Sequence, residues 1–199
     1  MGRIRAALAS GNEHKLRELR ALLSDWEIEP IDIAEAPAET GATFYENARA
    51  KARFGRTMAE PGVWTLGEDS GLEVAGLGGR PGIRSARYAG PNGTDEENVA
   101  KLLEELAGVS GDERRARYVS ELVCISPDRA EFRGTGTLEG RIVEAPRGAA
   151  GFGYDPVFAP LGAERTVAEL GDEWKREHSH RARAARALAE ALGAAAEAL

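Results

Sequence analysis

Strand-like and helix-like segments interleave along the whole chain, and this order constrains the fold more than any other feature. Apolar residues at 3.6-residue spacing predict helices, whereas short apolar or alternating segments predict strands. Leu16, Leu19, Leu22 and Leu23, for example, share one face of a helix that follows a first apolar segment. Interleaved strands and helices favour an α/β or mixed-sheet fold. No repeat or convincing linker divides the sequence, so we predict one domain over residues 1–199.

Local start and stop signals bound the predicted elements. Capping boxes at Thr43–Glu46 and Thr94–Glu97 open two helices, because a Thr and a Glu three residues apart satisfy free N–H groups at a helix start. Two glycine-rich stretches, 71–93 and 148–156, are predicted loops, and the first is long enough to be a candidate functional loop. Predicted strands are 3–9, 27–33, 63–66, 117–126, 130–137 and 138–144, and predicted helices are 13–24, 43–58, 94–106, 166–170 and 179–199.

The charge of the chain limits its classes of partner. The formal net charge is −7 at pH 7, whereas nucleic-acid binders usually carry a basic surplus, so we expect no nucleic-acid partner. A small anionic substrate is compatible, because a few inward-facing Lys and Arg can form a local positive site. No apolar run approaches the roughly 20 residues of a membrane span, so no membrane partner is expected. The only cysteine, Cys124, is predicted to be a core thiol, and a cytoplasmic localisation is expected.

The first candidate site is the strand–loop–helix element at residues 8–15. Gly11 lets the backbone turn tightly, and the start of the following helix presents N–H groups and a positive dipole end that suit phosphate. Ser10 and Asn12 add side-chain donors, and Lys15 falls in the first helical turn. The alternative is that Asn12 only caps the helix and Lys15 is a solvated charge. The pattern is not that of a Walker A loop.

The second candidate is the acidic segment Glu68-Asp69-Ser70-Gly71, which we predict to be a turn at the end of a strand. Two adjacent carboxylates can bind a hard cation such as Mg²⁺ and position a water molecule. Because neighbouring strand residues point to opposite faces, only one of Glu68 and Asp69 should point fully into a site, unless the turn bends both inward. The alternative is an ordinary acidic turn.

Three further segments combine residue types that suit a nucleotide. Residues 78–88 place arginines beside glycines and could frame an anion, although arginines in loops are more often solvated. Residues 151–156 place aromatic rings next to Asp155, which would suit stacking and hydrogen bonding to a base, or the rings only pin the turn to the core. The third segment is residues 175–181. Its Ser179 is a good N-cap, which places His180 and Arg181 in the first turn of the last helix. Cations there oppose the helix dipole, which indicates either a bound anion or exposure to solvent.

Six motifs follow one another in a specific order and spacing. They are Ser-Gly-Asn-x-x-Lys at 10–15, Glu-Thr-Gly-x-Thr-Phe-x-Glu-Asn-Ala-x-x-Lys at 39–51, Asp-Ser-Gly-Leu at 69–72, Gly-x-Pro-Gly-Ile-x-Ser-Ala-Arg-Tyr at 79–88, Gly-Phe-Gly-Tyr-Asp-Pro at 151–156 and Lys-x-x-x-Ser-His-Arg at 175–181. Over essentially its whole length the chain thus resembles the Ham1/RdgB-type inosine triphosphate pyrophosphatases.

The resemblance implies a fold and an activity. The implied fold is a single two-lobed α/β domain with a long mixed β-sheet flanked by helices, and with a substrate cleft between the lobes. The implied protein is a homodimer. The implied activity is the Mg²⁺-dependent hydrolysis of the purine nucleoside triphosphates ITP, dITP and XTP to the monophosphate and pyrophosphate.

The resemblance also assigns roles by position in the motifs. Asp69 matches the catalytic carboxylate, which accepts a proton and binds the metal, and Glu39 matches a second metal-associated acid. Residues that match substrate contacts are Ser10, Gly11, Asn12, Glu13, His14 and Lys15 in the triphosphate loop, Lys51 and Ser70 elsewhere, and Phe152, Gly153, Tyr154, Asp155, Lys175, His180 and Arg181 around the base.

The chain departs from the usual family pattern at three positions. Ser10 stands where Thr is frequent, Glu68 where Asp is common, and Ala150 where Gly often precedes the aromatic loop. The hydroxyl is kept at Ser10, and the longer side chain of Glu68 can still reach a metal. Two other functions stay open at this point: a related pyrophosphatase for pyrimidine or modified nucleotides, and a nucleotide-binding regulator without turnover.

Overall fold

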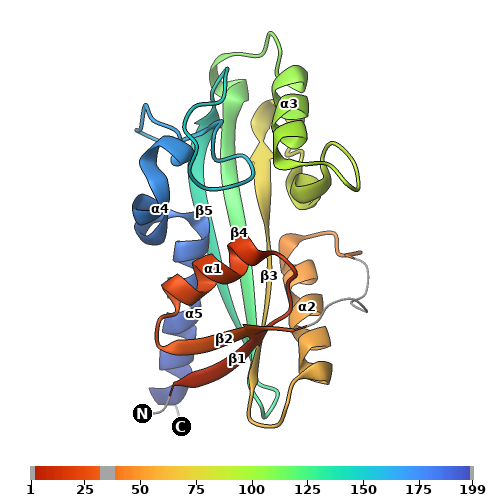
Figure 1. Cartoon of the computed structure of the whole chain (residues 1–199), viewed down its shortest axis with the longest axis vertical. Coiled ribbons are helices and arrows are strands. Elements are labelled where there is room, and N and C mark those ends of the chain that lie inside the picture. The colour runs from red at the N-terminus through yellow and green to blue at the C-terminus, as the bar shows by residue number, and fades with distance from the viewer. Residues whose placement is uncertain (1–2, 32–38, 198–199) are drawn as a thin grey trace. The chain divides into compact units, whose positions relative to one another are not determined.

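The computed structural model describes residues 3–31 and 39–197 (Figure 1). Residues 32–33 of the predicted second strand and 198–199 of the predicted last helix lie outside this range. The strands are β1 (Ile4–Leu8), β2 (Trp26–Pro30), β3 (Trp64–Val74), β4 (Arg115–Ile125), β5 (Glu131–Ile142) and β6 (Phe158–Pro160). The α-helices are α1 (Glu13–Leu22), α2 (Phe44–Met58), α3 (Asp95–Glu105), α4 (Val167–His178) and α5 (His180–Glu197), and the 3₁₀-helices are η1 (Ala75–Leu77), η2 (Gly82–Arg87) and η3 (Gly111–Arg114).

The described strands form one mixed sheet in the order β2-β1-β3-β4-β5-β6. Strand β1 pairs in parallel with β2 and β3, whereas β5 and β6 are antiparallel. The predicted α/β class with a mixed sheet flanked by helices is therefore confirmed. No helix within the described ranges is long and apolar enough to cross a membrane.

The chain divides into two compact units, and β3, β4 and β5 each contribute residues to both. The first unit comprises Met1–Asp69, Ser120–Gly136 and His180–Leu199, and the second comprises Ser70–Val119 and Thr137–Ser179.

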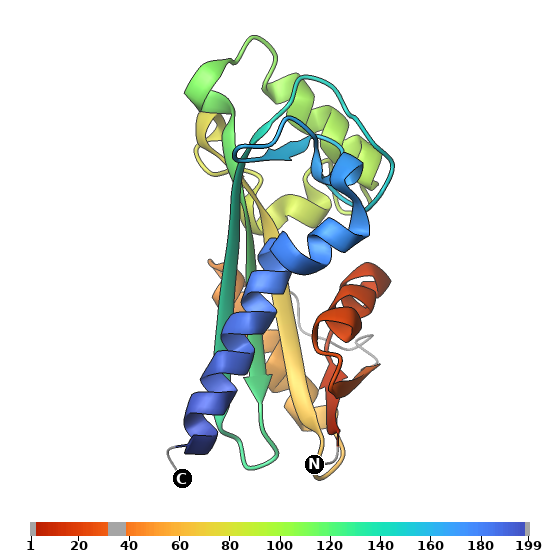
Figure 2. The same cartoon turned by 90° about the vertical axis from the view of Figure 1, so that its left-hand side faces the viewer.

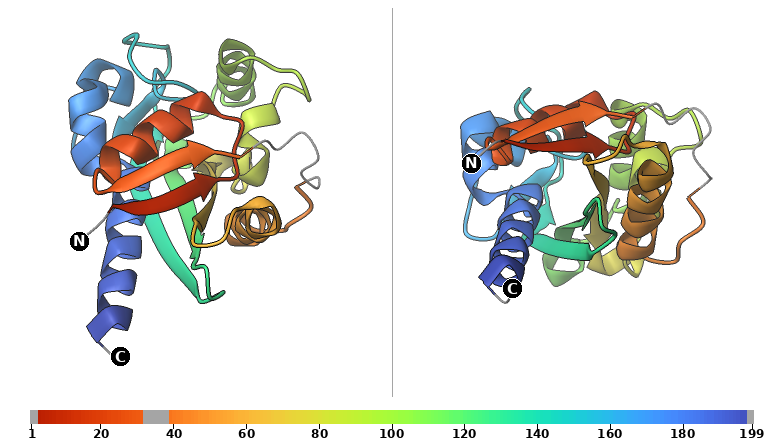
Figure 3. Two further views of the ribbon diagram at one scale, coloured as in Figure 1. Left: turned by 60° about the horizontal axis from the view of Figure 1, so that its bottom comes forward. Right: turned by 90° about the horizontal axis from the view of Figure 1, so that it is seen from below.

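In the first unit the connections create a switch point at β1. Strand β1 leads through α1 to β2 on one side, and β2 leads through α2 to β3 on the other side of β1. Because right-handed crossovers in opposite directions place their helices on opposite faces of a sheet, α1 and α2 lie on opposite faces (Figure 3). Open α/β sheets bind ligands beyond the carboxyl ends of the strands at such a point.

Strand β4 shows how the two faces of this unit are covered. Leu122 and Cys124 pack with apolar residues of α1 and α5, whereas Val123 and Ile125 pack with α2. This alternation is what a strand covered on both faces requires. Cys124 is fully buried, and burial raises the pKa of its thiol above the ordinary range. The predicted core thiol is confirmed.

The prediction of an acidic turn at residues 68–71 is wrong, because these residues lie within the 11-residue strand β3. The flanking glycines indicated a turn, but Gly67 instead allows α2 to pack closely on the strand. A Cβ atom at Gly67 would lie 2.1 Å from the carbonyl oxygen of Ala48 and 2.4 Å from the backbone nitrogen of Ala52. A glycine inside a strand often marks such a close approach of another backbone.

Residues 130–144 were predicted as two strands that meet between Thr137 and Leu138, whereas the structure has one strand, β5. Gly134 and Gly136 interrupt the apolar pattern of the sequence, but both face α5, which runs along β5 (Figure 2). A Cβ atom at Gly134 would lie 2.1 Å from the carbonyl oxygen of Ala184, and one at Gly136 would lie 2.0 Å from that of His180. The glycines therefore belong to the strand interior.

We expect Gly67→Ala to lower the free energy of unfolding by about 2 kcal/mol, because overpacking a tight interface costs on the order of 1–3 kcal/mol. The added methyl group would meet the backbone of α2, so the strand or the helix has to move. Urea denaturation measures the change. Gly193→Ala in α5 is the matched control, since among the described residues no atom beyond its chain neighbours and the nearby backbone of its own helix lies within 4 Å of the added Cβ. Ala favours a helix over Gly by about 1 kcal/mol, so this control should be stabilised. Equal loss of stability in both variants would contradict the packing account.

The second unit has its own core, built from α3, α4, β6 and its portions of the long strands. Strand β6 was not predicted, because three residues give too short a pattern to distinguish from a loop. Helix α4 continues to His178, whereas the prediction ended it at Leu170. That boundary coincides with Gly171, whose φ of 85° and ψ of 180° interrupt the helical backbone. The prediction thus ended the helix at this interruption and missed that helical backbone resumes after it.

Candidate active site

The carboxyl end of β1 places the first candidate group at the switch point. Leu8 is the last residue of β1 and pairs with Leu66, and the backbone nitrogen of Ala9 donates to the carbonyl of Leu66 at 2.8 Å. Strand β3 continues beyond this pair, so Glu68 and Asp69 follow directly after its last contact with β1. The loop that leads into α1 therefore leaves the sheet beside these two carboxylates.

The loop before α1 is ordered by its own side chains. The carboxamide oxygen of Asn12 accepts from the backbone nitrogen of Lys15 at 3.1 Å, and the hydroxyl oxygen of Ser10 accepts from the nitrogen of Asn12 at 3.2 Å. Asn12 is thus an N-cap, as the simpler interpretation of the sequence had it. Lys15 is not a solvated charge, since its side chain is 14% exposed and its Nζ lies 2.7 Å from Oε2 of Glu68.

Glu68 is fully buried and surrounded by donors. Arg181 donates to its Oε1 through Nε at 3.2 Å and Nη2 at 3.1 Å, and the hydroxyl of Ser120 donates to the same oxygen at 3.0 Å. Burial alone would raise the pKa of Glu68, but Arg181 and Lys15 hold it well below its usual range. We infer that Glu68 is a charged anchor for two cations.

The positive charge of Arg181, in the first turn of α5, lies between two carboxylates of the protein. Arg181 is 1% exposed, and its Nη1 contacts the carboxylate of Glu18 on α1 while its other nitrogens contact Glu68. Burial would lower the pKa of Arg181, but Glu68 and Glu18 raise it. The sequence left a bound anion or solvent exposure as explanations. The structure excludes exposure and supplies two carboxylates of the protein as the anions.

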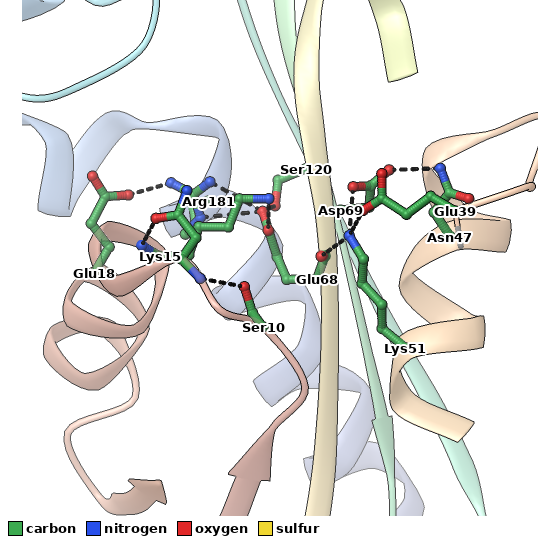
Figure 4. Close-up of polar contacts among 11 residues, drawn as sticks. Ser10, Lys15, Glu18, Glu39, Asn47, Lys51, Glu68, Asp69, Ser120 and Arg181 are labelled. Carbon is green, nitrogen blue, oxygen red and sulfur yellow. Dashed lines mark hydrogen bonds and ion pairs between the residues drawn. The ribbon is translucent and has the colours of Figure 1, made fainter. Parts of the chain in front are cut away.

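Asp69 lies on the opposite face of β3, against α2 (Figure 4). Its Oδ1 accepts from Nζ of Lys51 at 2.9 Å, and its Oδ2 accepts from Nδ2 of Asn47 at 3.1 Å. Nζ of Lys51 also lies 2.5 Å from Oε1 of Glu39 and donates to the carbonyl oxygen of Glu68 at 3.2 Å. Asn47 and Lys51 are four residues apart on α2, so both reach the same stretch of strand.

The electrostatics around Asp69 combine burial with opposite charge. Burial raises the pKa of Asp69, while the charges of Lys51 and Lys15 oppose the rise without cancelling it. Burial alone would lower the pKa of Lys51, but Asp69 and Glu39 raise it above its ordinary value. Lys51 thus stays charged between the two carboxylates for which the sequence predicted a metal.

Strand alternation separates the two acidic residues, as expected from the sequence for adjacent strand positions. Glu68 points to the α1 and α5 face and pairs with Lys15, whereas Asp69 points to the α2 face and pairs with Lys51 (Figure 4). Both pairs lie just beyond the last residue pair of β1 with β3, Leu8 and Leu66.

A second group of predicted residues comes together within the second unit. Nζ of Lys175 lies 2.8 Å from Oδ2 of Asp155, and both side chains are about 5% exposed or less. The same Nζ lies 4.7 Å from the ring centre of Phe152. The backbone nitrogen of Phe152 donates to Oδ2 of Asp155 at 3.0 Å, and the hydroxyl of Tyr118 donates to Oδ1 at 3.2 Å. Three of the predicted base-pocket residues therefore form one contact group.

Tyr154 and the loop at residues 78–88 have structural roles. Tyr154 is buried in the core, and its hydroxyl donates to the carbonyl oxygen of Ser85 at 2.8 Å. The hydroxyl of Ser85 in turn accepts from the nitrogen of Leu72 at 2.8 Å. Arg80 forms a 2.7 Å salt bridge with Glu105. Tyr154 thus pins its loop to the core, the alternative that the sequence left open.

The remaining predicted residues are distributed over both units. Gly11, Glu13 and His14 are exposed around the start of α1, and Nδ1 of His14 lies 3.0 Å from Arg17. Ser70 follows Asp69 in β3, and the backbone nitrogen of Gly153 donates to Asp95 at 2.7 Å. His180 is buried as the first residue of α5.

The sequence interpretation missed Asn47, Glu18, Ser120 and Tyr118, which contact Asp69, Arg181, Glu68 and Asp155. A signal existed for Asn47, which lies in the quoted motif one helical turn before Lys51. The other three reach partners that are 37 to 163 residues away in the sequence, and no local pattern reports such pairs.

Known proteins resemble this chain over most of its length. A dITP/XTP pyrophosphatase of Thermus thermophilus is 45% identical over 192 residues, which cover 94% of this chain and 91% of that protein. The dITP/XTP pyrophosphatase of Geobacillus kaustophilus is 46% identical over 189 residues, covering 92% of this chain and 91% of that protein.

Solved structures and a family profile agree with these relatives. A HAM1 protein from Coxiella burnetii superposes with a TM-score of 0.80 at 40% identity, covering 96% of this chain and 99% of that one. A nucleoside-triphosphatase / dITP/XTP pyrophosphatase from Mycobacterium abscessus superposes with a TM-score of 0.72 at 39% identity, covering 93% and 97%. The profile of the Ham1 family matches residues 6–191. The chain belongs to the Ham1 family.

Proposed function

We propose that this chain hydrolyses the non-canonical purine nucleoside triphosphates ITP, dITP and XTP to the monophosphate and pyrophosphate, and so removes them from the cytoplasmic nucleotide pool. Membership of the Ham1 family and the names of the relatives support this. The observation that carries the proposal is Asp69, a buried carboxylate held between Lys51 and Asn47 at the switch point of the sheet. We further propose that the protein acts as a homodimer.

Asp69 and Glu39 fit a magnesium ion. Both supply hard oxygen donors, and both contact a single cation, the Lys51 ammonium. Mg²⁺ in proteins is usually bound by one or two carboxylates, with water and substrate phosphates as its other ligands. When bound, the ion would supply charge neutralisation for the phosphate oxygens.

Asp69 acts on the water molecule that attacks the α-phosphorus. Lys51 and Asn47 each hold one of its oxygens, so the carboxylate has a fixed orientation. It accepts a proton from the water as the new oxygen–phosphorus bond forms, and the bond from the α-phosphorus to the leaving pyrophosphate breaks. Positioning of this kind provides most of the catalysis in phosphoryl transfer.

The residues around α1 stabilise the leaving pyrophosphate. The N–H groups of the loop at residues 10–12 and the positive end of α1 suit the phosphate oxygens, and Lys15 and Lys51 add two positive charges from opposite faces of β3. Glu68 keeps Lys15 beside this loop through their 2.7 Å contact. We assign the triphosphate to these residues of the first unit.

Base selection follows from the oxygen at position six of the purine. We assign the base to the group of Phe152, Asp155 and Lys175, where the aromatic ring can stack and the ammonium can donate to a 6-oxo group. The amino group of adenine would leave such a donor unpaired, and a buried unpaired donor is costly. Sites built around a hydrogen bond therefore reject the wrong substrate strongly.

A panel of triphosphates with pyrophosphate readout tests the proposed function. We expect kcat/KM for ITP, dITP and XTP to exceed that for ATP by about 100-fold or more, and chelation of divalent metal to abolish pyrophosphate release. CTP, UTP and GTP complete the panel. Comparable kcat/KM values for ITP and ATP would exclude the proposed selectivity, and no release from any triphosphate would exclude the enzyme function.

A further inference from the structure

The carboxylate of Asp155 lies at the centre of the group of residues to which we assign the base. It accepts from Nζ of Lys175, the backbone nitrogen of Phe152 and the hydroxyl of Tyr118 at 2.8, 3.0 and 3.2 Å. A Cβ atom at Gly151 would lie 2.1 Å from its Oδ2, so the loop wraps closely around this side chain. A carboxylate has about four acceptor positions, and these three donors engage most of them.

Tyr118 is the member of this group that is fixed from outside the loop. It lies on β4, is 6% exposed, and packs its ring on Phe158 of β6 with 4.6 Å between ring centres. Its hydroxyl therefore has a position set by the core of the second unit. Lys175 comes from α4, and Phe152 from the glycine-rich loop, so Asp155 connects a long side chain and a loop to a rigid strand.

Lys175 is the residue whose position this arrangement controls. Its side chain is 5% exposed, its Nζ contacts Asp155, and it lies over the ring of Phe152. An ammonium has three N–H donors, so a fixed partner for one of them narrows the directions of the others. Because the carboxylate that fixes Lys175 is itself held by the Tyr118 hydroxyl, a change at Tyr118 is transmitted to both the ammonium and the aromatic ring.

We propose that Tyr118 is a positioning residue for base discrimination: its hydroxyl holds Asp155, and thereby Lys175 and Phe152, in the arrangement that favours 6-oxo purines. The proposal rests on the proposed function. The hydroxyl of Tyr118 contacts Asp155, so we assign Tyr118 an indirect role through that carboxylate. It should therefore affect the recognition of the base and leave the chemistry at Asp69 unchanged.

Tyr118→Phe removes this hydroxyl and keeps the ring that packs on Phe158. We expect kcat/KM for ITP to fall about tenfold, through KM more than kcat, because a hydrogen bond to a charged acceptor is lost. The value for ATP should change less than about twofold, since ATP gains nothing from the arrangement. Tyr88→Phe is the matched control. It also deletes a tyrosine hydroxyl that donates to a carboxylate, that of Glu105 at 2.6 Å, but this pair lies outside the group around Asp155. The ratio of kcat/KM for ITP to kcat/KM for ATP in Tyr88→Phe should equal that of the wild type.

Calorimetric binding of IMP and AMP separates this inference from the proposed function, because it needs no turnover. Preference for IMP over AMP should be reduced in Tyr118→Phe and kept in Tyr88→Phe. An unchanged preference in Tyr118→Phe would overturn the inference, and so would an equal loss in both variants, which would indicate a general structural effect. A wild-type protein that prefers IMP but releases no pyrophosphate would refute the proposed function alone. A wild-type protein without any preference would refute the inference as well.

Discussion

Asp69→Asn should lower kcat for ITP about 10³-fold while the nucleotide still binds, because a general base typically contributes about 10²–10⁴-fold. The substitution is close in shape, but a carboxamide has a single acceptor oxygen, so it keeps the hydrogen bond from Lys51 or from Asn47 and not both. What it removes is the acceptor for the proton of the attacking water and one charge of the metal site. Steady-state kinetics with pyrophosphate readout measures the loss of turnover. Calorimetric binding of ITP, with divalent metal chelated, measures whether the nucleotide still binds.

Glu73→Gln is the control for this variant. Glu73 is an acidic residue of the same strand, and it forms a 2.7 Å surface salt bridge with Arg117. Its removal should leave kcat within about twofold of the wild type, because surface ion pairs contribute little. An Asp69→Asn enzyme with turnover near that of the control would show that another residue activates the water.

Glu68→Gln should have the largest effect on stability, lowering the free energy of unfolding by about 3 kcal/mol. The substitution keeps the size of the side chain but removes the buried charge that two cations share. Arg181 is 1% exposed and cannot reach solvent, and Glu18 is its other carboxylate contact. For a chain of this length the loss corresponds to a fall in Tm of about 6–12 °C.

Urea denaturation followed by tryptophan fluorescence measures this change, because Trp26 and Trp64 pack against the core of the first unit. The control is Glu60→Gln, which removes an exposed partner of Arg5 at 3.5 Å. It should change stability by no more than about 0.5 kcal/mol. If Glu68→Gln is as stable as this control, the buried carboxylate does not anchor the two cations.

The sequence predicted well those features that depend on neighbouring residues. The leucine spacing of α1 and the capping boxes at Thr43 and Thr94 are all found in the structure, because caps and helix faces involve residues three or four apart. The alternation that separates Glu68 from Asp69 is equally local. Motif order also identified the family without any knowledge of contacts.

The predictions failed where a glycine had a partner far away in the sequence. The predicted turn after Leu66 and the predicted division of residues 130–144 into two strands were wrong, and Gly67, Gly134 and Gly136 in these segments each allow a helix to approach a strand. Helix α2 lies shortly before β3 in the chain, whereas α5 begins 38 residues after the end of β5 (180 against 142), and no local pattern reports that contact. The length of β3 could therefore not be obtained from the residues around the acidic pair alone.

The same limit applies to the candidate site. Lys15, Glu68 and Arg181 were predicted as parts of separate motifs, and Arg181 was assigned to the base on resemblance. The structure places it against Glu68, which is 113 residues away, because α5 returns to pack beside α1. The charge of Arg181 and its place at a helix start indicated an anion, but only the fold identifies which one.

Hydrolysis of ITP in water enriched in ¹⁸O, with the products resolved by ³¹P NMR, tests the central claim most directly. Attack on the α-phosphorus predicts that the label appears in IMP and that the pyrophosphate is unlabelled, with no IDP or phosphate formed during the reaction. Label in the pyrophosphate, or IDP and phosphate as the products, would place the cleavage elsewhere and contradict the account of Asp69 given above.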